Sequence, residues 1–285
     1  MELTNAEIRA AVRAALAEDL GGGDVTTLAT VPANANSVAR MNAREPMTVA
    51  GLRFAEITFH ELSPKNKIQK LVRDGQKVST GKTLLKISGP SRAILSAERV
   101  ALNFVQRLSG VATATAQFVN EIRGTNAKII DTRKTTPGWR RFEKYAVKCG
   151  GGQNHRLGLF DMILIKDNHL VALRDEKPNA IAAAVARARK KFPKLKVEVE
   201  ADTLAQVAQA ADAGADIILL DNMTLKQLRD AVKIICGRAK TEASGGVNLQ
   251  TVRAIAATGV DFISVGAITH SARAVDIGLD FEHEM

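Results

Sequence analysis

The sequence predicts an α/β protein built around a parallel sheet, because short β-rich runs alternate with helical patterns through the second half of the chain. The runs end at Asp131, Ile165, Glu200, Asp221, Ala243 and Val265. The last four ends follow one another at nearly equal intervals, and each interval is long enough to hold one helix. Repeated strand–helix units of this size predict right-handed crossovers and a parallel sheet, arranged as a barrel or covered by helices on both faces.

The segments within these units support this fold class. Ile181, Ala184, Val185 and Ala188 recur with the spacing of one helix face, which predicts a helix between two of the strands. Residues 217–220 are all apolar, which is typical of a strand buried on both faces. A doubly wound open sheet is the alternative to a barrel, but the first strand lacks the glycine-rich turn that marks that fold.

The first part of the chain predicts a separate set of elements. Thr4 and Glu7 form a capping box at the start of an amphipathic helix. Residues 37–49 alternate in polarity roughly as strands do, and residues 54–62 have a helical pattern. These elements precede the strand–helix units and suggest a smaller domain.

A long helix is expected over residues 91–123, with a break where Ser109 and Gly110 interrupt the apolar pattern. Arg99 lies on the first part of this helix. By itself, an arginine in this position is most often a solvated surface charge.

Residues 74–87 contain Gly81-Lys82-Thr83, which is similar to the end of a phosphate-binding loop. Gly75 precedes Gly81 by five intervening residues, whereas the motif requires four. A strand pattern, rather than the helix of that motif, follows the threonine. We therefore reject a nucleotide-binding loop and expect a small β-hairpin here.

The net charge of +10 bears on which partners to expect. One Trp and one Tyr leave few aromatic rings for stacking on bases, and Lys and Arg are spread along the whole chain. We therefore expect no nucleic-acid partner. A charged exterior and anionic small substrates account for the positive charge instead.

Compartment and membrane association follow from other features of the sequence. No run approaches the roughly 18 apolar residues of a membrane span, and no signal-peptide pattern is visible. Cys149 and Cys236 are far apart and in no metal-binding spacing, which favours free thiols. We expect a soluble cytoplasmic protein without a membrane partner.

Polar and glycine residues gather at the predicted carboxyl ends of the strands, which in a barrel form the catalytic face. They are Asp131, Lys166, Glu200, Asp221, Ser244 and Gly266. Several charges buried on one rim require ligands or a metal ion to compensate them. We therefore expect the active site at this face.

Three groups of residues give this face its chemistry. The cations Arg133, Lys134, His155, Arg156 and Lys166 suit carboxylates and phosphates. The acids Glu200 and Asp221 suit Mg²⁺ or sugar hydroxyls, and an all-oxygen site argues against zinc. Backbone amides of Ser244-Gly245-Gly246 and Val265-Gly266-Ala267 suit a terminal phosphate.

Together these groups predict a Mg²⁺-assisted barrel enzyme that acts on a phosphosugar and a carboxylate. No nucleophile elbow for acyl transfer is present, and the five histidines have no metal-binding spacing. His270 is a candidate for the phosphate site, whereas His60 and His283 are expected on the surface or in the core. Cys149 is expected to be a small buried residue rather than a nucleophile.

Several long motifs resemble the quinolinate phosphoribosyltransferase family, also called carboxylating nicotinate-nucleotide pyrophosphorylase. The motifs are residues 131–138 (DTRKTTPG), 150–156 (GGGQNHR), 165–169 (IKDNH) and 220–223 (LDNM). The resemblance covers essentially the whole chain, including Glu98, Arg99 and Asn103.

The resemblance implies transfer of a phosphoribosyl group from phosphoribosyl pyrophosphate to the ring nitrogen of quinolinate, followed by decarboxylation. The products would be nicotinate mononucleotide, pyrophosphate and CO₂, as in de novo NAD biosynthesis. It also implies an N-terminal α/β sandwich domain (1–112, joined by the tail 273–285) and an incomplete six- or seven-stranded α/β barrel (113–272). A homodimer or higher homo-oligomer with shared active sites is implied as well.

The same resemblance implies roles for individual residues. The quinolinate carboxylates would be bound by Arg99, Arg133, His155, Arg156 and Lys166, with Arg99 acting across the dimer interface. Lys134 and Lys166 would face the phosphoribosyl donor, and Glu200 and Asp221 its ribose hydroxyls and Mg²⁺, directly or through water; these four would be the catalytic residues. Thr132, Ser244, Gly245, Gly246, Val265, Gly266 and Ala267 would complete the substrate site.

Three alternatives stay open from the sequence. A related phosphoribosyltransferase-like protein of molybdate transport would use another acceptor. A basic nucleic-acid-binding protein would show salt-sensitive DNA retention. A non-catalytic scaffold would keep its function without Lys166 and Glu200.

Overall fold

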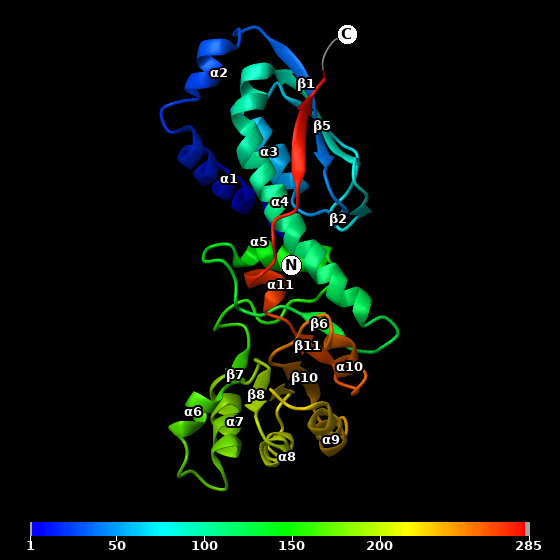
Figure 1. The fold of residues 1–285 in the computed structure, drawn as a ribbon. Helices are drawn as coiled ribbons and strands as arrows, with labels where there is room; N and C mark the ends of the chain where they lie inside the picture. Colours follow the sequence, from blue (N-terminus) through cyan, green and yellow to red (C-terminus); the bar gives the residue numbers. More distant parts are fainter. Residues whose placement is uncertain (1, 283–285) are drawn as a thin grey trace. The chain divides into compact units, whose positions relative to one another are not determined.

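A computed structural model describes residues 2–282 of the chain, which divide into two units (Figure 1). The first unit contains residues 2–116, 141–151 and 272–282, and the second contains residues 117–140 and 152–271. The predicted domain boundary between residues 112 and 113 falls inside a continuous helix and stays a prediction. His283 lies outside the described residues.

The second unit contains a parallel sheet of six strands in the order β6-β11-β10-β9-β8-β7. The strands are β6 (Lys128–Ile130), β7 (Ile163–Ile165), β8 (Val197–Ala201), β9 (Ile217–Asp221), β10 (Lys240–Ser244) and β11 (Phe262–Ser264). Strands β7 to β11 follow one another around the sheet and β6 then joins β11. A doubly wound sheet would reverse its order at a switch point, so the prediction of an incomplete α/β barrel is confirmed.

Helices follow the strands of this unit as the sequence pattern predicts. They are α6 (Asp167–Val171), α7 (Ala180–Lys191), α8 (Leu204–Asp212), α9 (Leu225–Ile235), α10 (Val252–Ala256) and α11 (Ala267–His270). Thr203 begins α8 and Thr224 begins α9, and each forms a capping box with the glutamine three residues on. The caps satisfy amide groups that would otherwise lack partners at the helix starts.

Strand β8 shows how the barrel sorts its side chains. Val197, Val199 and Ala201 are fully buried, and Glu198 and Glu200 alternate with them. Because successive side chains of a strand point to opposite faces, the two glutamates share the face away from the apolar residues. Both carboxyl groups therefore point toward the interior of the barrel.

The first unit is built on an antiparallel sheet in the order β12-β1-β5-β3. Its strands are β1 (Asn36–Ala43), β3 (Lys67–Lys70), β5 (Thr83–Pro90) and β12 (Ile277–Phe281), and a separate pair joins β2 (Met47–Thr48) to β4 (Lys77–Val78). Its helices are α1 (Asn5–Leu20), α2 (Val25–Thr30), α3 (Leu52–Leu62), α4 (Ser91–Glu121) and α5 (Arg140–Cys149). Figure 1 shows the C-terminal β12 alongside β1 and α4 against the same sheet, where Met41, Leu85 and Ala101 are fully buried.

Two local predictions in this unit are confirmed. The Thr4 hydroxyl accepts a hydrogen bond from the Glu7 amide at 3.2 Å, and the Glu7 carboxylate accepts one from the Thr4 amide at 2.9 Å. This capping box begins α1 as expected. The helix predicted over residues 54–62 is also present, as α3.

The predicted break at Ser109 and Gly110 is wrong, because α4 runs through both residues. Ser109 is fully buried, and its hydroxyl accepts a hydrogen bond from the Ala50 amide at 2.9 Å. Gly110 lies so close to the chain at Arg273 that a Cβ atom would come within 2.0 Å of the carbonyl oxygen. Both residues serve tertiary contacts, and they do not end the helix.

The β-hairpin predicted within residues 74–87 is also wrong. Strand β4 pairs with β2, and β5 pairs with β1 and β3, so the two strands are not partners. The rejection of a phosphate-binding loop is confirmed, because Thr83 begins a strand and no helix follows Lys82 directly.

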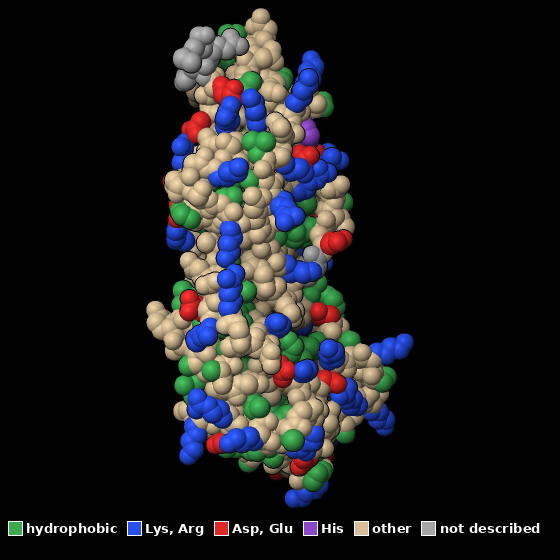
Figure 2. Space-filling model, turned by 90° about the vertical axis from the view of Figure 1, so that its right-hand side faces the viewer, with side chains coloured by type: hydrophobic (Ala, Val, Ile, Leu, Met, Phe, Trp, Pro, Cys, Tyr) green, Lys and Arg blue, Asp and Glu red, His purple; other side chains and the backbone are tan. Residues whose placement is uncertain are grey.

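Surface charge and helix composition complete the description. Figure 2 shows Lys and Arg side chains scattered over the face in view, with Asp and Glu among them. Within residues 2–282, no helix combines the length and apolar character that crossing a bilayer requires.

The close approach at Gly110 makes a stability prediction. Gly110→Ala should lower the free energy of unfolding by about 1–3 kcal/mol, because the backbone at Arg273 must move to admit the methyl group. Gly22→Ala is the control, since no heavy atom lies within 4 Å of its Cβ position; it should change stability by less than about 0.5 kcal/mol. Denaturant unfolding of both variants measures the difference, and equal stabilities would contradict the packing argument.

Candidate active site

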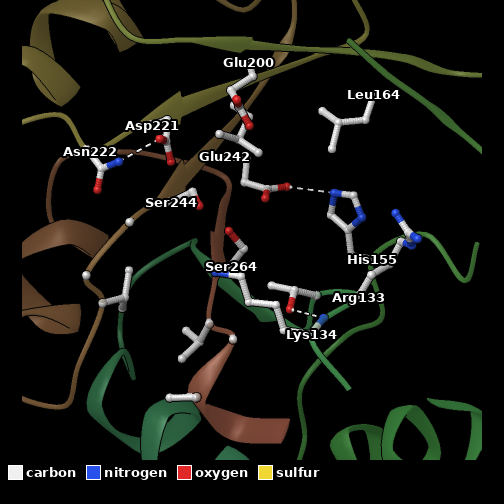
Figure 3. Close-up of a pocket in the computed structure, with 18 of the residues that line it drawn as sticks. Arg133, Lys134, His155, Leu164, Glu200, Asp221, Asn222, Glu242, Ser244 and Ser264 are labelled. Carbon is white, nitrogen blue, oxygen red and sulfur yellow. Dashed lines mark hydrogen bonds and ion pairs between the residues drawn. The ribbon is translucent and has the colours of Figure 1, made fainter. Parts of the chain in front are cut away.

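A cavity of about 880 Å³ opens at the carboxyl ends of the barrel strands, within the second unit (Figure 3). Every predicted site residue of this unit lines it: Thr132, Arg133, Lys134, His155, Arg156, Lys166, Glu200, Asp221, Ser244, Gly245, Gly246, Val265, Gly266 and Ala267. Arg99 is exposed on α4 and does not line the cavity. The strand ends therefore bring the predicted cations, acids and glycine loops together.

The acidic wall of the cavity comes from β8 and β9. Glu200 forms an ion pair with Lys166, which directly follows β7. The Asp221 carboxylate accepts a hydrogen bond from the side-chain amide of Asn222 at 2.7 Å. Figure 3 shows both acids in the cavity lining, opposite Lys134. Two carboxylates and the nearby Ser244 hydroxyl form an all-oxygen donor set that suits a hard cation such as Mg²⁺.

The cationic wall comes from the segment after β6 and from Arg156. The Arg133 Nε atom is buried and has no hydrogen-bond partner among the described residues. Burial, and then the positive charge of Arg133, lower the pKa of Arg156 from its usual value. Two guanidinium groups that repel each other and lack full compensation are suited to bind an anion.

Asp131 directly follows β6, so its predicted place at the carboxyl end of a strand is confirmed. The side chain is fully buried and does not line the cavity. Its carboxylate accepts hydrogen bonds from the His155 amide at 2.9 Å and from the Asn154 side chain at 2.7 Å. Gln153 meanwhile bonds the backbone of β6. Asp131 therefore anchors the loop that carries His155 and Arg156.

The His155 ring contacts two buried acids on different strands. Its Nε2 atom lies 2.9 Å from Glu198 Oε2 and 3.4 Å from Glu242 Oε2. Burial by itself lowers the pKa of His155, but the hydrogen bonds and charges of Glu198 and Glu242 outweigh it and raise the value to about 10. Burial has the opposite effect on an acid, and it raises the pKa of Glu198 to about 7.

The protonation state of His155 follows from the relative size of two effects. The Arg156 amide lies 2.8 Å from Nδ1, a contact that suits a neutral ring. A backbone hydrogen bond contributes only about 1 kcal/mol. A buried carboxylate without a compensating cation costs roughly several kcal/mol. The larger effect favours the charged ring.

Sequence reasoning missed Glu198 and Glu242. A usable signal was present, because each stands two residues before a predicted rim residue, Glu200 or Ser244, and so shares its face of the strand. The ligand atoms of Glu198, Glu242 and His155 lie within 4.8 Å of one another, close enough to surround a cation. The positive charge between these acids is already supplied by the ring.

The glycine loops form the remaining wall. Gly245 has a φ of +97°, and a Cβ atom there would meet Asn222 Oδ1 at 2.1 Å, so only glycine fits. His270 lines the cavity beside Gly266, and its Nδ1 lies 2.6 Å from the Ser271 hydroxyl. Backbone amides beside a histidine suit a phosphate group.

Cys149 lies in the first unit and is not part of the cavity lining. Burial, followed by the charge of Asp74, raises the pKa of its thiol to about 12. The thiol is therefore protonated at neutral pH and is a poor nucleophile.

Comparisons with known proteins agree with this geometry. Family models for the quinolinate phosphoribosyl transferase N-terminal and C-terminal domains match residues 24–109 and 111–280. A nicotinate-nucleotide pyrophosphorylase [carboxylating] of Mycobacterium leprae is 44% identical over 95% of this chain and 96% of its own length. The chloroplastic enzyme of the same name from Arabidopsis thaliana is 42% identical over 98% of this chain and 84% of its own length.

A solved structure gives the same result at the level of the fold. The nicotinate-nucleotide pyrophosphorylase of Francisella tularensis superposes with a TM-score of 0.93 and 42% identity, covering 99% of this chain and 98% of its own. Similarity of this extent spans both units, the cavity and the motifs that line it. The chain belongs to the quinolinate phosphoribosyltransferase family.

Proposed function

We propose that this protein transfers the phosphoribosyl group of phosphoribosyl pyrophosphate to quinolinate and decarboxylates the product. The reaction gives nicotinate mononucleotide, pyrophosphate and CO₂, a step of NAD biosynthesis. The observation that carries the proposal is one cavity that is lined by Arg133 and Arg156, by the carboxylates of Glu200 and Asp221, and by two glycine loops. The relatives named above support quinolinate, rather than the acceptor of a molybdate-transport protein.

The acceptor site would use the cationic wall. Arg133, His155 and Arg156 would bind the two carboxylates of quinolinate, and Lys166 would help to hold the diacid. These contacts would point the ring nitrogen at the anomeric carbon of the donor. Fixed orientation of two reactants accounts for a large share of the rate of such transfers.

The donor site would use the opposite wall. Lys134 would contact the phosphoribosyl donor, and Glu200 and Asp221 would bind its ribose hydroxyls. The loops at Gly245 and Gly266 would hold the terminal phosphate. As pyrophosphate leaves, the sugar acquires oxocarbenium character, and the nearby carboxylates would stabilise this positive charge.

Decarboxylation would follow on the ribosylated ring. The bond from the ring carbon to one carboxylate breaks, its electron pair stays on that carbon, and a proton then replaces CO₂. The positive ring nitrogen stabilises the carbanion, so the protein has mainly to hold the ring and exclude water.

We also propose that Glu200 and Asp221 hold Mg²⁺, directly or through water. Their all-oxygen environment supports this assignment, although Glu200 must then share its charge between the metal and Lys166. When bound, Mg²⁺ would neutralise charge on the departing pyrophosphate.

Two further expectations belong to this proposal. Arg99 would enter the active site of a partner subunit in a homodimer; its exposure on α4 supports this role. Cys149 and Cys236 are both free, which supports a reducing compartment such as the cytoplasm.

The acceptor site is tested by Arg133→Ala. The purified wild-type protein should release pyrophosphate and CO₂ only when quinolinate and the donor are both present. Arg133→Ala should weaken quinolinate binding about tenfold or more, because it removes a charge-assisted contact with a carboxylate. Calorimetry measures both affinities, with the exposed Arg187→Ala on α7 as the control. Unchanged quinolinate affinity would remove Arg133 from the site.

The metal site is tested by chelation together with Asp221→Ala. A chelator should abolish wild-type turnover, and added Mg²⁺ should restore it. Asp221→Ala should lower kcat about tenfold or more, and excess Mg²⁺ should not rescue it, because the carboxylate also handles the sugar. Asp212→Ala, an exposed acid on α8, is the matched control. Wild-type turnover in the chelator would contradict the metal proposal.

The shared site is tested by mixing inactive subunits. When Arg99→Ala and Lys166→Ala subunits are mixed, half of the random dimers contain one of each, and each of these dimers keeps one of its two sites intact. The mixture should therefore recover about a quarter of wild-type activity. Lys166→Ala mixed with Glu200→Ala should recover none, because both changes fall in the barrel unit. Equal outcomes for the two mixtures, after demonstrated subunit exchange, would argue against sharing.

A further inference from the structure

We propose that Glu198 and Glu242 are positioning residues for the acceptor site, which hold the His155 ring in the cavity wall in its charged form. The inference rests on the proposed function, because it assigns that charge to a carboxylate of quinolinate. Neither glutamate was expected to take part from the sequence motifs.

The geometry points to His155 as the group that both acids serve. Glu198 comes from β8 and Glu242 from β10, and β9 lies between these strands in the sheet. Both carboxyl groups nevertheless approach the same ring nitrogen, Nε2, at 2.9 and 3.4 Å. Figure 3 shows the Glu242 side chain directed at the ring. The ring is thus held from two sides of the barrel interior.

Burial keeps water from weakening the interaction of the two acids with the ring. Glu198 is 0% and Glu242 1% exposed, so neither charge is screened by water. Glu198 Oε1 accepts no hydrogen bond from any described residue, and Glu242 Oε2 faces Nε2 of His155 at 3.4 Å. Buried carboxylates normally satisfy their oxygen atoms, so the contact with His155 is what the described structure offers them.

The other charged groups around the ring act against its positive charge. Arg133 and Arg156 line the same cavity and disfavour a further cation by repulsion. Asp131 contacts the backbone amide of His155 rather than the ring. Of the described acids printed in contact with the ring, Glu198 and Glu242 favour the imidazolium, so loss of either acid should move the pKa of His155 down toward its ordinary range.

This dependence has a definite sign. In the wild type the ring stays charged through neutral pH, because the pKa of His155 lies near 10. With one acid removed, the charge would be present at about pH 6 and lost as the pH rises through the neutral range. Quinolinate binding should then weaken with rising pH in the variant, where the wild type is nearly constant.

The binding experiment compares Glu242→Gln with the wild type and with Glu143→Gln. Glu143 is another fully buried acid, paired with Arg107 in the first unit, and serves as the matched control. Glu242→Gln should weaken quinolinate binding about tenfold or more at about pH 8.5 and much less at about pH 6. Affinity for phosphoribosyl pyrophosphate should change little. Glu143→Gln should be less stable but should keep the wild-type pH profile.

A second measurement examines the His155 ring of the wild-type protein itself. Nitrogen NMR of histidine-labelled wild-type protein, without substrate, reports whether both ring nitrogens of His155 carry protons; His155→Gln identifies the signal. Both should be protonated at about pH 8. A neutral ring there, a bound metal ion displacing the ring proton, or a wild-type pH profile in Glu242→Gln would overturn the inference. A charged ring in a protein that never turns over quinolinate would instead overturn the proposed function.

Discussion

Compensation of charge among the side chains of one cavity, some of them buried, is the constraint on which this site depends. Five cations would repel one another at the carboxyl end of the barrel if none had a partner. Lys166 has Glu200, and His155 has a buried pair of acids. The buried Nε atom of Arg133 has no hydrogen-bond partner within residues 2–282. The positive charge that the protein leaves uncompensated is the part available to a dianionic substrate.

The alternation of side chains along each strand determines where the charged groups of the site lie. Residues two apart on β8 and β10 share the inner face of the barrel, so each strand supplies one deep and one rim position. The deep positions, Glu198 and Glu242, set the state of a cation, while the rim positions face the cavity directly. A buried Asp131 then fixes the loop that brings the histidine over these acids. The residues that support the site and the residues that line the cavity thus occupy nearby positions on the same strands and the same loop.

The sequence was informative wherever structure is local. The strand end at Asp221 was predictable because this polar residue terminates the apolar run of residues 217–220. The break predicted at Gly110 was wrong because glycine is needed there for close packing against the backbone at Arg273, which is far away in the sequence. The hairpin failed for the same reason, since strand pairing is not local. Glu242 went unnoticed because its partner, His155, lies distant in sequence.

Arg99 marks what a single chain does not provide, since its proposed role depends on a second subunit. The central claim, convergence of separate strand ends on one diacid, needs a structure with quinolinate and a donor analogue bound. The account predicts the two carboxylates on Arg133, His155 and Arg156, with the terminal phosphate at the loops of Gly245 and Gly266. Quinolinate bound elsewhere, or bound with its carboxylates facing Glu200 and Asp221, would contradict it.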